Sequence, residues 1–206
     1  MVAIIDYDAG NIKSVEKALQ YLGQEVIVTR SDKEILSADA VILPGVGAFG
    51  DAMRKLQNYN LIPVIHQVID HGTPFLGICL GLQLLFDESE ESPGVKGLGI
   101  LPGKIKRIPE GNGLKIPHIG WNSLEFPKQG KLYGNLINKP YVYFVHSYYL
   151  ESDDPSIVVA TTEYNVTIHA SVEKDNIFAC QFHPEKSSDV GLKILKNFLD
   201  IQKEQV

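Results

Sequence analysis

Short apolar runs alternate with longer segments of helical spacing through the first 86 residues. Four runs have the length and residue types of buried strands. In one intervening segment, residues 11–22, apolar side chains recur at the i, i+3, i+4 spacing of an amphipathic helix, and Gly23 follows as an end signal. Pro63 is placed to begin a further helix. Three strands are expected at 2–6, 25–29 and 40–43, and a fourth in the short run that leads to Cys79. The other helices are expected at 32–38 and, broken near 58–61, at 49–70.

This alternation predicts a parallel, doubly wound sheet with helices on both faces. Ligands of such sheets bind beyond the carboxyl ends of the strands. Residues 6–10, residues 44–50 and Cys79 all follow predicted strand ends. We therefore expect a functional site built from these three places.

The pattern changes after residue 86. Residues 87–94 are acidic and rich in turn formers, which predicts a solvated loop, and residues 189–204 carry the apolar stripe of a final helix. No internal repeat or linker is visible. We expect one α/β domain over residues 1–206, with a mostly parallel central sheet, helices on both faces and an added antiparallel section in the second half. Strand-like runs of that half lie at 104–108, 122–126, 141–150, 157–162, 167–173 and 177–182.

Composition narrows the class of protein. The 206-residue chain has a net charge of −6 and no Lys/Arg-rich block, which argues against a nucleic-acid binder. No apolar run approaches the roughly 18 residues of a membrane span, and no signal-type segment precedes the first strand. The two cysteines make a poor disulfide framework, and no Cys/His cluster has zinc-site spacing. We expect a soluble, cytoplasmic protein without a metal or cofactor.

Residues 73–86 read as strand, tight turn and helix, with Cys79 between Gly77 and Gly81. This is the arrangement of a nucleophile elbow, in which the glycines clear space for a sharp bend. A sulfur at the start of a helix is favoured as thiolate. The alternative is a buried cysteine in an apolar segment, and the segment alone leaves both open.

His183, Pro184 and Glu185 close the last predicted strand. Two residues apart on an extended backbone, the histidine and the glutamate lie on one side, and Pro184 disfavours a helical conformation at His183. Glu185 could then hold the imidazole in one tautomer while the other nitrogen faces a nucleophile, which with Cys79 would make a triad. A structural His–Glu pair at a strand end is the alternative.

A thiolate that attacks an amide needs hydrogen-bond donors for the developing oxyanion. The glycine-rich segment 44–50 can present bare N–H groups, and we expect donors at Val46 and Gly47, with the N–H of Leu80 as another. The segment could instead bind phosphate, but it lacks the Gly-Lys-Ser/Thr ending of a P-loop.

These motifs together resemble the class I glutamine amidotransferases, and the resemblance spans nearly the whole chain. Within that family, several stretches are similar to the glutaminase subunits of imidazole glycerol phosphate synthase, from histidine biosynthesis. The stretches are 6–11, 44–49, 117–122, 143–148 and 181–188.

The resemblance implies a mechanism. Cys79 attacks the side-chain amide of glutamine, His183 protonates the departing ammonia and then activates water, and Glu185 orients His183. The family pattern also implies that segment 45–47 reorients before it offers an N–H to the oxyanion, so the free subunit should be a poor glutaminase. The residues expected to line the glutamine pocket are Gly47, Gln83, His146, Ser147 and Tyr148; their alternatives are a turn residue, a helix-surface residue and strand packing.

A partner is implied as well: a (βα)8-barrel cyclase that forms a heterodimer with the glutaminase and receives ammonia through a channel. Four residues match positions that face this partner: Asn11, Trp121, Asn122 and Lys186. A core aromatic is the alternative for Trp121.

Other functions stay open at this point. The chain could be the glutaminase of another amidotransferase, such as that of anthranilate or pyridoxal phosphate synthesis, from which only the partner-facing segments separate it. A hydrolase of γ-glutamyl peptides is disfavoured, because 206 residues leave little room for an extended cleft. An inactive binding module would be expected to lack Cys79, His183 or Glu185, and all three are present.

Overall fold

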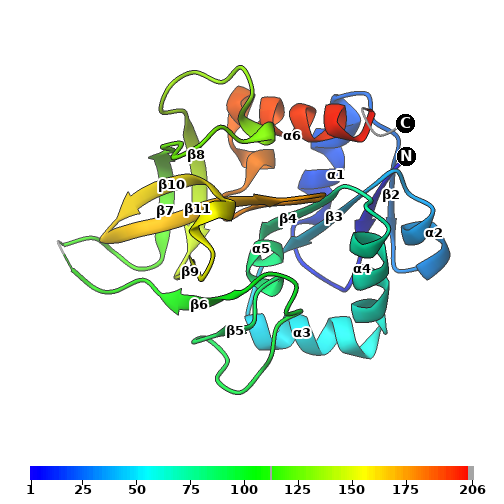
Figure 1. Cartoon of the computed structure of the whole chain (residues 1–206), viewed down its shortest axis with the longest axis horizontal. Coiled ribbons are helices and arrows are strands. Elements are labelled where there is room, and N and C mark those ends of the chain that lie inside the picture. The colour runs from blue at the N-terminus through cyan, green and yellow to red at the C-terminus, as the bar shows by residue number, and fades with distance from the viewer. Residues whose placement is uncertain (112, 204–206) are drawn as a thin grey trace.

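The computed structural model describes residues 1–111 and 113–203, and within them the central sheet has seven strands in the order β10-β11-β12-β4-β3-β1-β2 (Figure 1). The five strands from β12 to β2 pair in parallel, whereas β10, β11 and β12 pair antiparallel. This confirms the predicted fold class. The strands are β1 Val2–Ile5, β2 Val26–Thr29, β3 Ala40–Gly45, β4 Phe75–Cys79, β10 Val158–Tyr164, β11 Val166–Lys174 and β12 Ile177–Cys180.

Helices cover both faces of this sheet (Figure 1). Successive strand residues point to opposite faces, so Ile5 packs in the core beneath α3 and α4, while Ile4 packs in the core beneath α1 and α6. Both faces are therefore apolar, as the continuous hydrophobic runs of the first half predicted. The helices are α1 Ile12–Tyr21, α2 Asp32–Leu36, α3 Phe49–Asn58, α4 Leu61–Asp70, α5 Leu80–Leu84 and α6 Ser188–Lys203.

The second half adds two smaller sheets to the described part of the chain. One has the order β5-β6-β9, and the other is the antiparallel pair β7 and β8. The strands are β5 Glu88–Ser89, β6 Gly103–Arg107, β7 His118–Ser123, β8 Tyr141–His146 and β9 Tyr148–Ser152. Short 3₁₀ turns lie at Lys131–Tyr133, Pro155–Ile157 and Pro184–Lys186.

The expected single strand over residues 141–150 is wrong. The chain forms two strands that belong to different sheets, since β8 pairs with β7 and β9 pairs with β6. Ser147 lies between them, and its carbonyl accepts a hydrogen bond from the N–H of Ile108. Only His146 and Ser147 interrupt the apolar run, and the sequence did not show that the chain changes its partner strand at these two polar residues.

Several boundaries also differ. The strand expected at 122–126 begins earlier, at His118, because β7 pairs with the whole of β8. The acidic segment 87–94 is not wholly solvated, since β5 forms within it and Ser89 is buried. The predicted final helix is described as far as Lys203, and residue 204 lies outside the described residues.

Two of the three predicted places, segment 44–50 and Cys79, lie together at the carboxyl ends of β3 and β4 and line one pocket, whereas none of residues 6–10 lines it. In the register of β3 and β4, Gly45 lies opposite Cys79, and Cys180 of β12 lies opposite Ile78. Among the described residues, no helix combines the length and the apolar character needed to cross a membrane.

Candidate active site

Cys79 stands at a sharp turn between β4 and α5. Its backbone has φ 54° and ψ −106°, an unusual conformation for a non-glycine residue. The two flanking glycines make room for the turn. A Cβ on Gly81 would lie 1.9 Å from the carbonyl oxygen of Leu43, and one on Gly77 would lie 2.8 Å from the carbonyl oxygen of Gly81. The predicted elbow geometry is confirmed.

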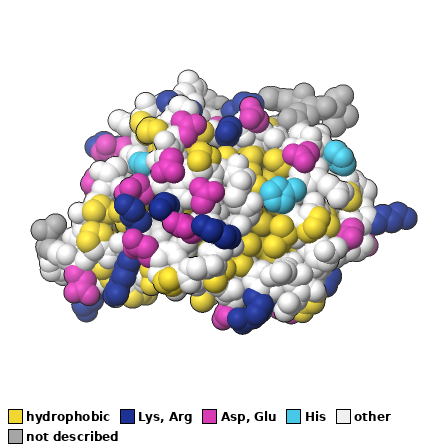
Figure 2. All heavy atoms as spheres, turned by 60° about the horizontal axis from the view of Figure 1, so that its bottom comes forward, with side chains coloured by type: hydrophobic (Ala, Val, Ile, Leu, Met, Phe, Trp, Pro, Cys, Tyr) yellow, Lys and Arg dark blue, Asp and Glu magenta, His cyan; other side chains and the backbone are white. Residues whose placement is uncertain are grey.

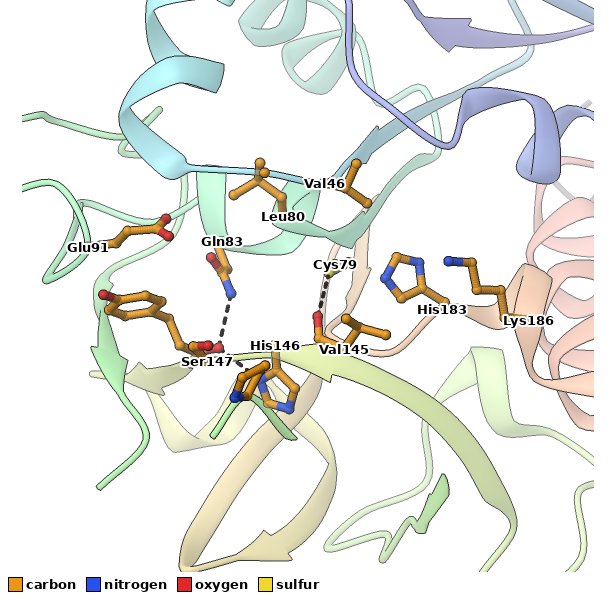
Figure 3. A pocket seen from close by; sticks show the side chains of 13 residues that line it. Val46, Cys79, Leu80, Gln83, Glu91, Val145, His146, Ser147, His183 and Lys186 are labelled. Atoms are coloured by element: carbon orange, nitrogen blue, oxygen red, sulfur yellow. Dashed lines mark hydrogen bonds between the residues drawn. The ribbon is translucent and has the colours of Figure 1, made fainter. Parts of the chain in front are cut away.

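His183 reaches the same place from the far end of the chain. It follows β12, and its backbone N–H donates to the carbonyl of Tyr143 in β8 at 2.9 Å. The ring Nδ1 lies 2.8 Å from Oε1 of Glu185, and the two side chains are 3% and 0% exposed. Figure 3 shows the His183 ring beside Cys79, at the wall of one pocket. Because the carboxylate accepts at Nδ1, the ring's Nε2 is left for the sulfur.

Burial and the neighbouring charges have opposite effects on the pKa of His183. Burial alone would lower the pKa of the ring, but its hydrogen bond to Cys79 and that to Glu185, together with their negative charges, outweigh this and raise the pKa to about 9. At neutral pH the ring therefore holds a proton beside the sulfur. Asn11 adds a second hydrogen bond to the same carboxylate oxygen, from Nδ2 at 2.6 Å.

The pocket around these groups has a volume of about 260 Å³. This is slightly below the roughly 300–1,000 Å³ of drug-sized ligand sites and suits a molecule of amino-acid size. All five residues expected to line a glutamine pocket lie on its wall. The lining residues are Val46, Gly47, Cys79, Leu80, Gln83, Glu91, Pro117, Val145, His146, Ser147, Tyr148, His183 and Lys186.

Two of these residues fix the start of β9. Gln83 Nε2 donates to the carbonyl of Tyr148 at 3.1 Å, and His146 Nδ1 lies 2.8 Å from the same oxygen. Burial lowers the pKa of His146 to about 3, so the ring is neutral and its single N–H points to this carbonyl. Its Nε2 then accepts from Nδ1 of His118 at 3.1 Å. Both ring nitrogens of His146 thus contact other groups of the protein, and its role in binding substrate stays a prediction.

The glycine-rich segment borders the pocket beside the elbow. Figure 3 shows Val46 next to Cys79, and Gly47 has a φ of 104°, which favours glycine. Tyr7 holds the preceding strand, since its hydroxyl donates to the carbonyl of Pro44 at 2.8 Å. Burial, and next the nearby Cys79, raise the pKa of Tyr7. The roles of Val46, Gly47 and Leu80 as oxyanion donors stay a prediction.

The residues predicted to face a partner lie in two places. Trp121, on β7, is 51% exposed, so the core-aromatic alternative is wrong. Its neighbour Asn122 donates to the carbonyl of Glu163 at 3.0 Å. Lys186 is exposed and lines the pocket beyond His183 (Figure 3), while Asn11 contacts Glu185. A partner-facing role for these four residues stays a prediction.

Sequence reasoning missed two polar residues of the site. Gln181 contacts Cys79, and it lies two residues before His183, a spacing on an extended backbone that could have indicated a shared face. Glu91, from the acidic segment, lines the pocket and accepts the N–H of Phe49 at 2.7 Å. No local pattern distinguished it from the other acids there.

The surface carries both signs of charge. On the face seen in Figure 2, Lys and Arg side chains lie among Asp and Glu side chains, with hydrophobic side chains between them. Because the two signs of charge are interspersed, side chains such as Lys104 and Glu88, or Lys106 and Glu151, form ion pairs. The sequence argued against a concentrated basic face, and the face in this view carries none.

Comparison with known proteins identifies the family. The family model described as glutamine amidotransferase class-I matches residues 3–201. The chain belongs to this family. It is 52% identical over 205 residues to the imidazole glycerol phosphate synthase subunit HisH of Thermosynechococcus vestitus, covering 98% of each chain. It is likewise 52% identical to the HisH subunit of Moorella thermoacetica, covering 96% of this chain and 93% of the other.

Solved structures agree on the fold. One described as a glutamine amidotransferase has a TM-score of 0.77 at 20% identity, with 98% of this chain and 100% of that chain covered. A glutamine amidotransferase from Thermotoga maritima has a TM-score of 0.65 at 17% identity, with 99% and 84% covered. At such identities these likenesses concern the fold, whereas the HisH relatives place the chain in one branch of the amidotransferase family and among the subunits of a larger synthase.

Proposed function

We propose that Cys79, His183 and Glu185 carry out the glutaminase reaction of this amidotransferase, which serves imidazole glycerol phosphate synthesis in histidine biosynthesis. The observation that carries the assignment is the placement of one imidazole between a cysteine at a strained turn and a buried carboxylate, on the wall of a small pocket. The relatives named HisH support the pathway.

The chemistry follows from the positions of these groups. The Cys79 thiolate attacks the side-chain amide carbon of glutamine, and N–H groups of Val46 or Gly47 and of Leu80 stabilise the oxyanion. His183 gives its proton to the departing nitrogen, and ammonia leaves a γ-glutamyl thioester. The neutral His183 then takes a proton from water, whose oxygen attacks the thioester, and glutamate leaves as Cys79 is restored.

Glutamine is held along the pocket by groups on the far side of Cys79. Gln83 and the segment His146–Ser147–Tyr148 line that part of the wall. Glu91 lies at the opposite end of the pocket from His183 (Figure 3), where its carboxylate can pair with the α-ammonium of glutamine. In this proposed pose the side-chain amide, rather than the amino acid backbone, lies at the sulfur.

The partner is proposed to be a (βα)8-barrel cyclase that forms a heterodimer with this chain and receives the ammonia. The pair β7 and β8 offers a surface for it, since Ile119, Trp121 and Tyr141 expose 51–60% of their area there. Exposed aromatic and aliphatic side chains grouped on one face are typical of an interaction site. Cytoplasmic localisation is proposed as well, where the free thiols of Cys79 and Cys180 stay reduced.

The test is glutamate release from glutamine by the purified chain, alone and then with the barrel cyclase and its nucleotide ligand. Strong stimulation by the cyclase, lost in Cys79→Ala, supports both the thiol chemistry and the partner. High activity without the cyclase would instead indicate a self-contained glutaminase. A folded chain that is inactive in both settings would contradict the proposed function.

A further inference from the structure

A buried amide contacts the sulfur of Cys79. Gln181 lies between β12 and His183 and is fully buried. Its Nε2 is 3.6 Å from Sγ of Cys79, a distance suited to an N–H···S hydrogen bond. The glutaminase chemistry described above makes no use of this side chain.

The direction of this contact is fixed by a backbone carbonyl. Gln83 Nε2 donates to the carbonyl of Tyr148 at 3.1 Å, and a carbonyl can only accept. The same nitrogen lies 2.9 Å from Oε1 of Gln181, to which it gives its second hydrogen. The NH₂ group of Gln181 must therefore point to Sγ, because the reverse orientation would set two NH₂ groups against each other.

We propose that Gln181 stabilises the thiolate of Cys79 by donating a hydrogen bond to its sulfur. The thiol and the thiolate of Cys79 use different neighbours of the sulfur. As a thiol it can donate to the carbonyl of Val145, which is distant at 3.9 Å, and as a thiolate it accepts from Gln181. A hydrogen bond to the charged form of a buried group favours that form. The chain Tyr148–Gln83–Gln181 thus biases the proton toward His183.

This inference deepens the proposed function, because it rests on Cys79 being the nucleophile. It also gives Gln83 two tasks. One of its hydrogens holds Gln181, so the residue on the wall of the substrate pocket and the amide at the sulfur are held by one network. Truncation of Gln83 would then change the reactivity of Cys79 as well as glutamine binding.

The experiment measures alkylation of Cys79 by iodoacetamide as a function of pH, without glutamine. Gln181→Met removes the donor at similar volume. We expect the pH of half-maximal alkylation to rise by about one unit, with up to about a tenfold slower reaction near neutral pH, as for loss of one hydrogen bond to a charged group. Cys180 should not interfere, since it is fully buried and burial raises the pKa of its thiol; Cys79→Ala checks this.

A second variant, Gln181→Glu, keeps an oxygen for Gln83 and sets an acceptor or a negative charge against the sulfur, so its shift should be larger. Ser171→Ala is the matched control, because Ser171 is equally buried on β11 and donates to the carbonyl of Ala179. Folding of each variant is checked by circular dichroism. An unchanged alkylation profile in either folded Gln181 variant would overturn the inference. If Cys79 of the wild-type protein shows the expected pH dependence of alkylation but the protein releases no glutamate from glutamine, the proposed function fails instead.

Discussion

The hydrogen bonds around His183 determine what each group of the site can do. Oε1 of Glu185 accepts from both His183 and Asn11, so the carboxylate fixes the imidazole tautomer and supplies a negative charge next to it. Among the described residues that line the pocket, no thiol other than that of Cys79 is present. Removal of these groups is therefore expected to have unequal effects.

We expect Cys79→Ala to abolish glutamate release, because no other described residue places a thiol in the pocket. Glu185→Gln keeps an oxygen that can accept from His183 but loses the charge, so we expect a fall in kcat of about 10²–10⁴-fold with measurable residual activity. Steady-state glutamate release on both variants, with equal thermal stability as the control, tests this. Full activity of Cys79→Ala would contradict the mechanism.

The raised pKa of His183 predicts a pH-dependent stability. Its folded-state pKa of about 9 exceeds the ordinary 6.5, so the stabilisation is fully present below 6.5 and is lost as pH rises through about 9. Relative to His183→Gln, the wild-type free energy of unfolding should fall by up to ~3 kcal/mol over this window. Urea denaturation of both proteins at several pH values measures it. A difference that stays constant with pH would contradict the assignment.

At the scale of elements, the elbow depends on how closely α5 approaches β3. Their contact leaves no volume at Gly81, where a Cβ would meet the backbone oxygen of Leu43. The strand end that carries Gly45 is equally close, since a Cβ there would lie 2.3 Å from the hydroxyl oxygen of Tyr7. The nucleophile is thus held by backbone packing, which a small change in volume disturbs.

We expect Gly81→Ala to lower the free energy of unfolding by about 1–3 kcal/mol, because α5 must move away from β3. Cys79 would move with it, so glutaminase activity should fall more than stability alone explains. Gly134→Ala is the control, since its Cβ would lie in ordinary contact, 3.8 Å from the carbonyl oxygen of Lys131. Chemical denaturation compares the two, and equal stability of both variants would show that the approach is not tight in solution.

For the molecule as a whole, the exposed face of β7 and β8 is the surface proposed for the partner. Trp121 packs edge-on against Tyr143, with ring centroids 5.9 Å apart, and half of its surface is left open. We expect Trp121→Ala to weaken cyclase binding by at least tenfold while the fold is kept, as for an aromatic anchor of an interface.

Calorimetric titration of the variant with the cyclase measures this effect. Tyr21→Ala is the matched control, because Tyr21 on α1 is an even more exposed aromatic outside β7 and β8. Unchanged cyclase affinity of Trp121→Ala, or an equal loss of affinity in Tyr21→Ala, would contradict the prediction that β7 and β8 form the partner surface.

The sequence by itself determined what local rules govern. Period and length predicted the β1–β4 alternation with its helices, and the glycines beside Cys79 predicted the elbow, because turn sterics depend on neighbouring residues. The pair of His183 and Glu185 was predicted correctly, but the extended backbone from which it was argued holds only at His183, because Glu185 lies in the 3₁₀ turn Pro184–Lys186. The fold class and the edge that holds the site followed from these patterns.

Only the tertiary structure decided what depends on pairing between distant strands. It set β12 beside β4, which brings His183 and Gln181 to Cys79, and it divided the apolar run at Ser147 between two sheets. Such pairings bury surface from both ends of the chain at once, and hydrophobic periodicity specifies which face is buried but not against which strand. The contacts of Asn11, Gln83 and Gln181 arise from that choice.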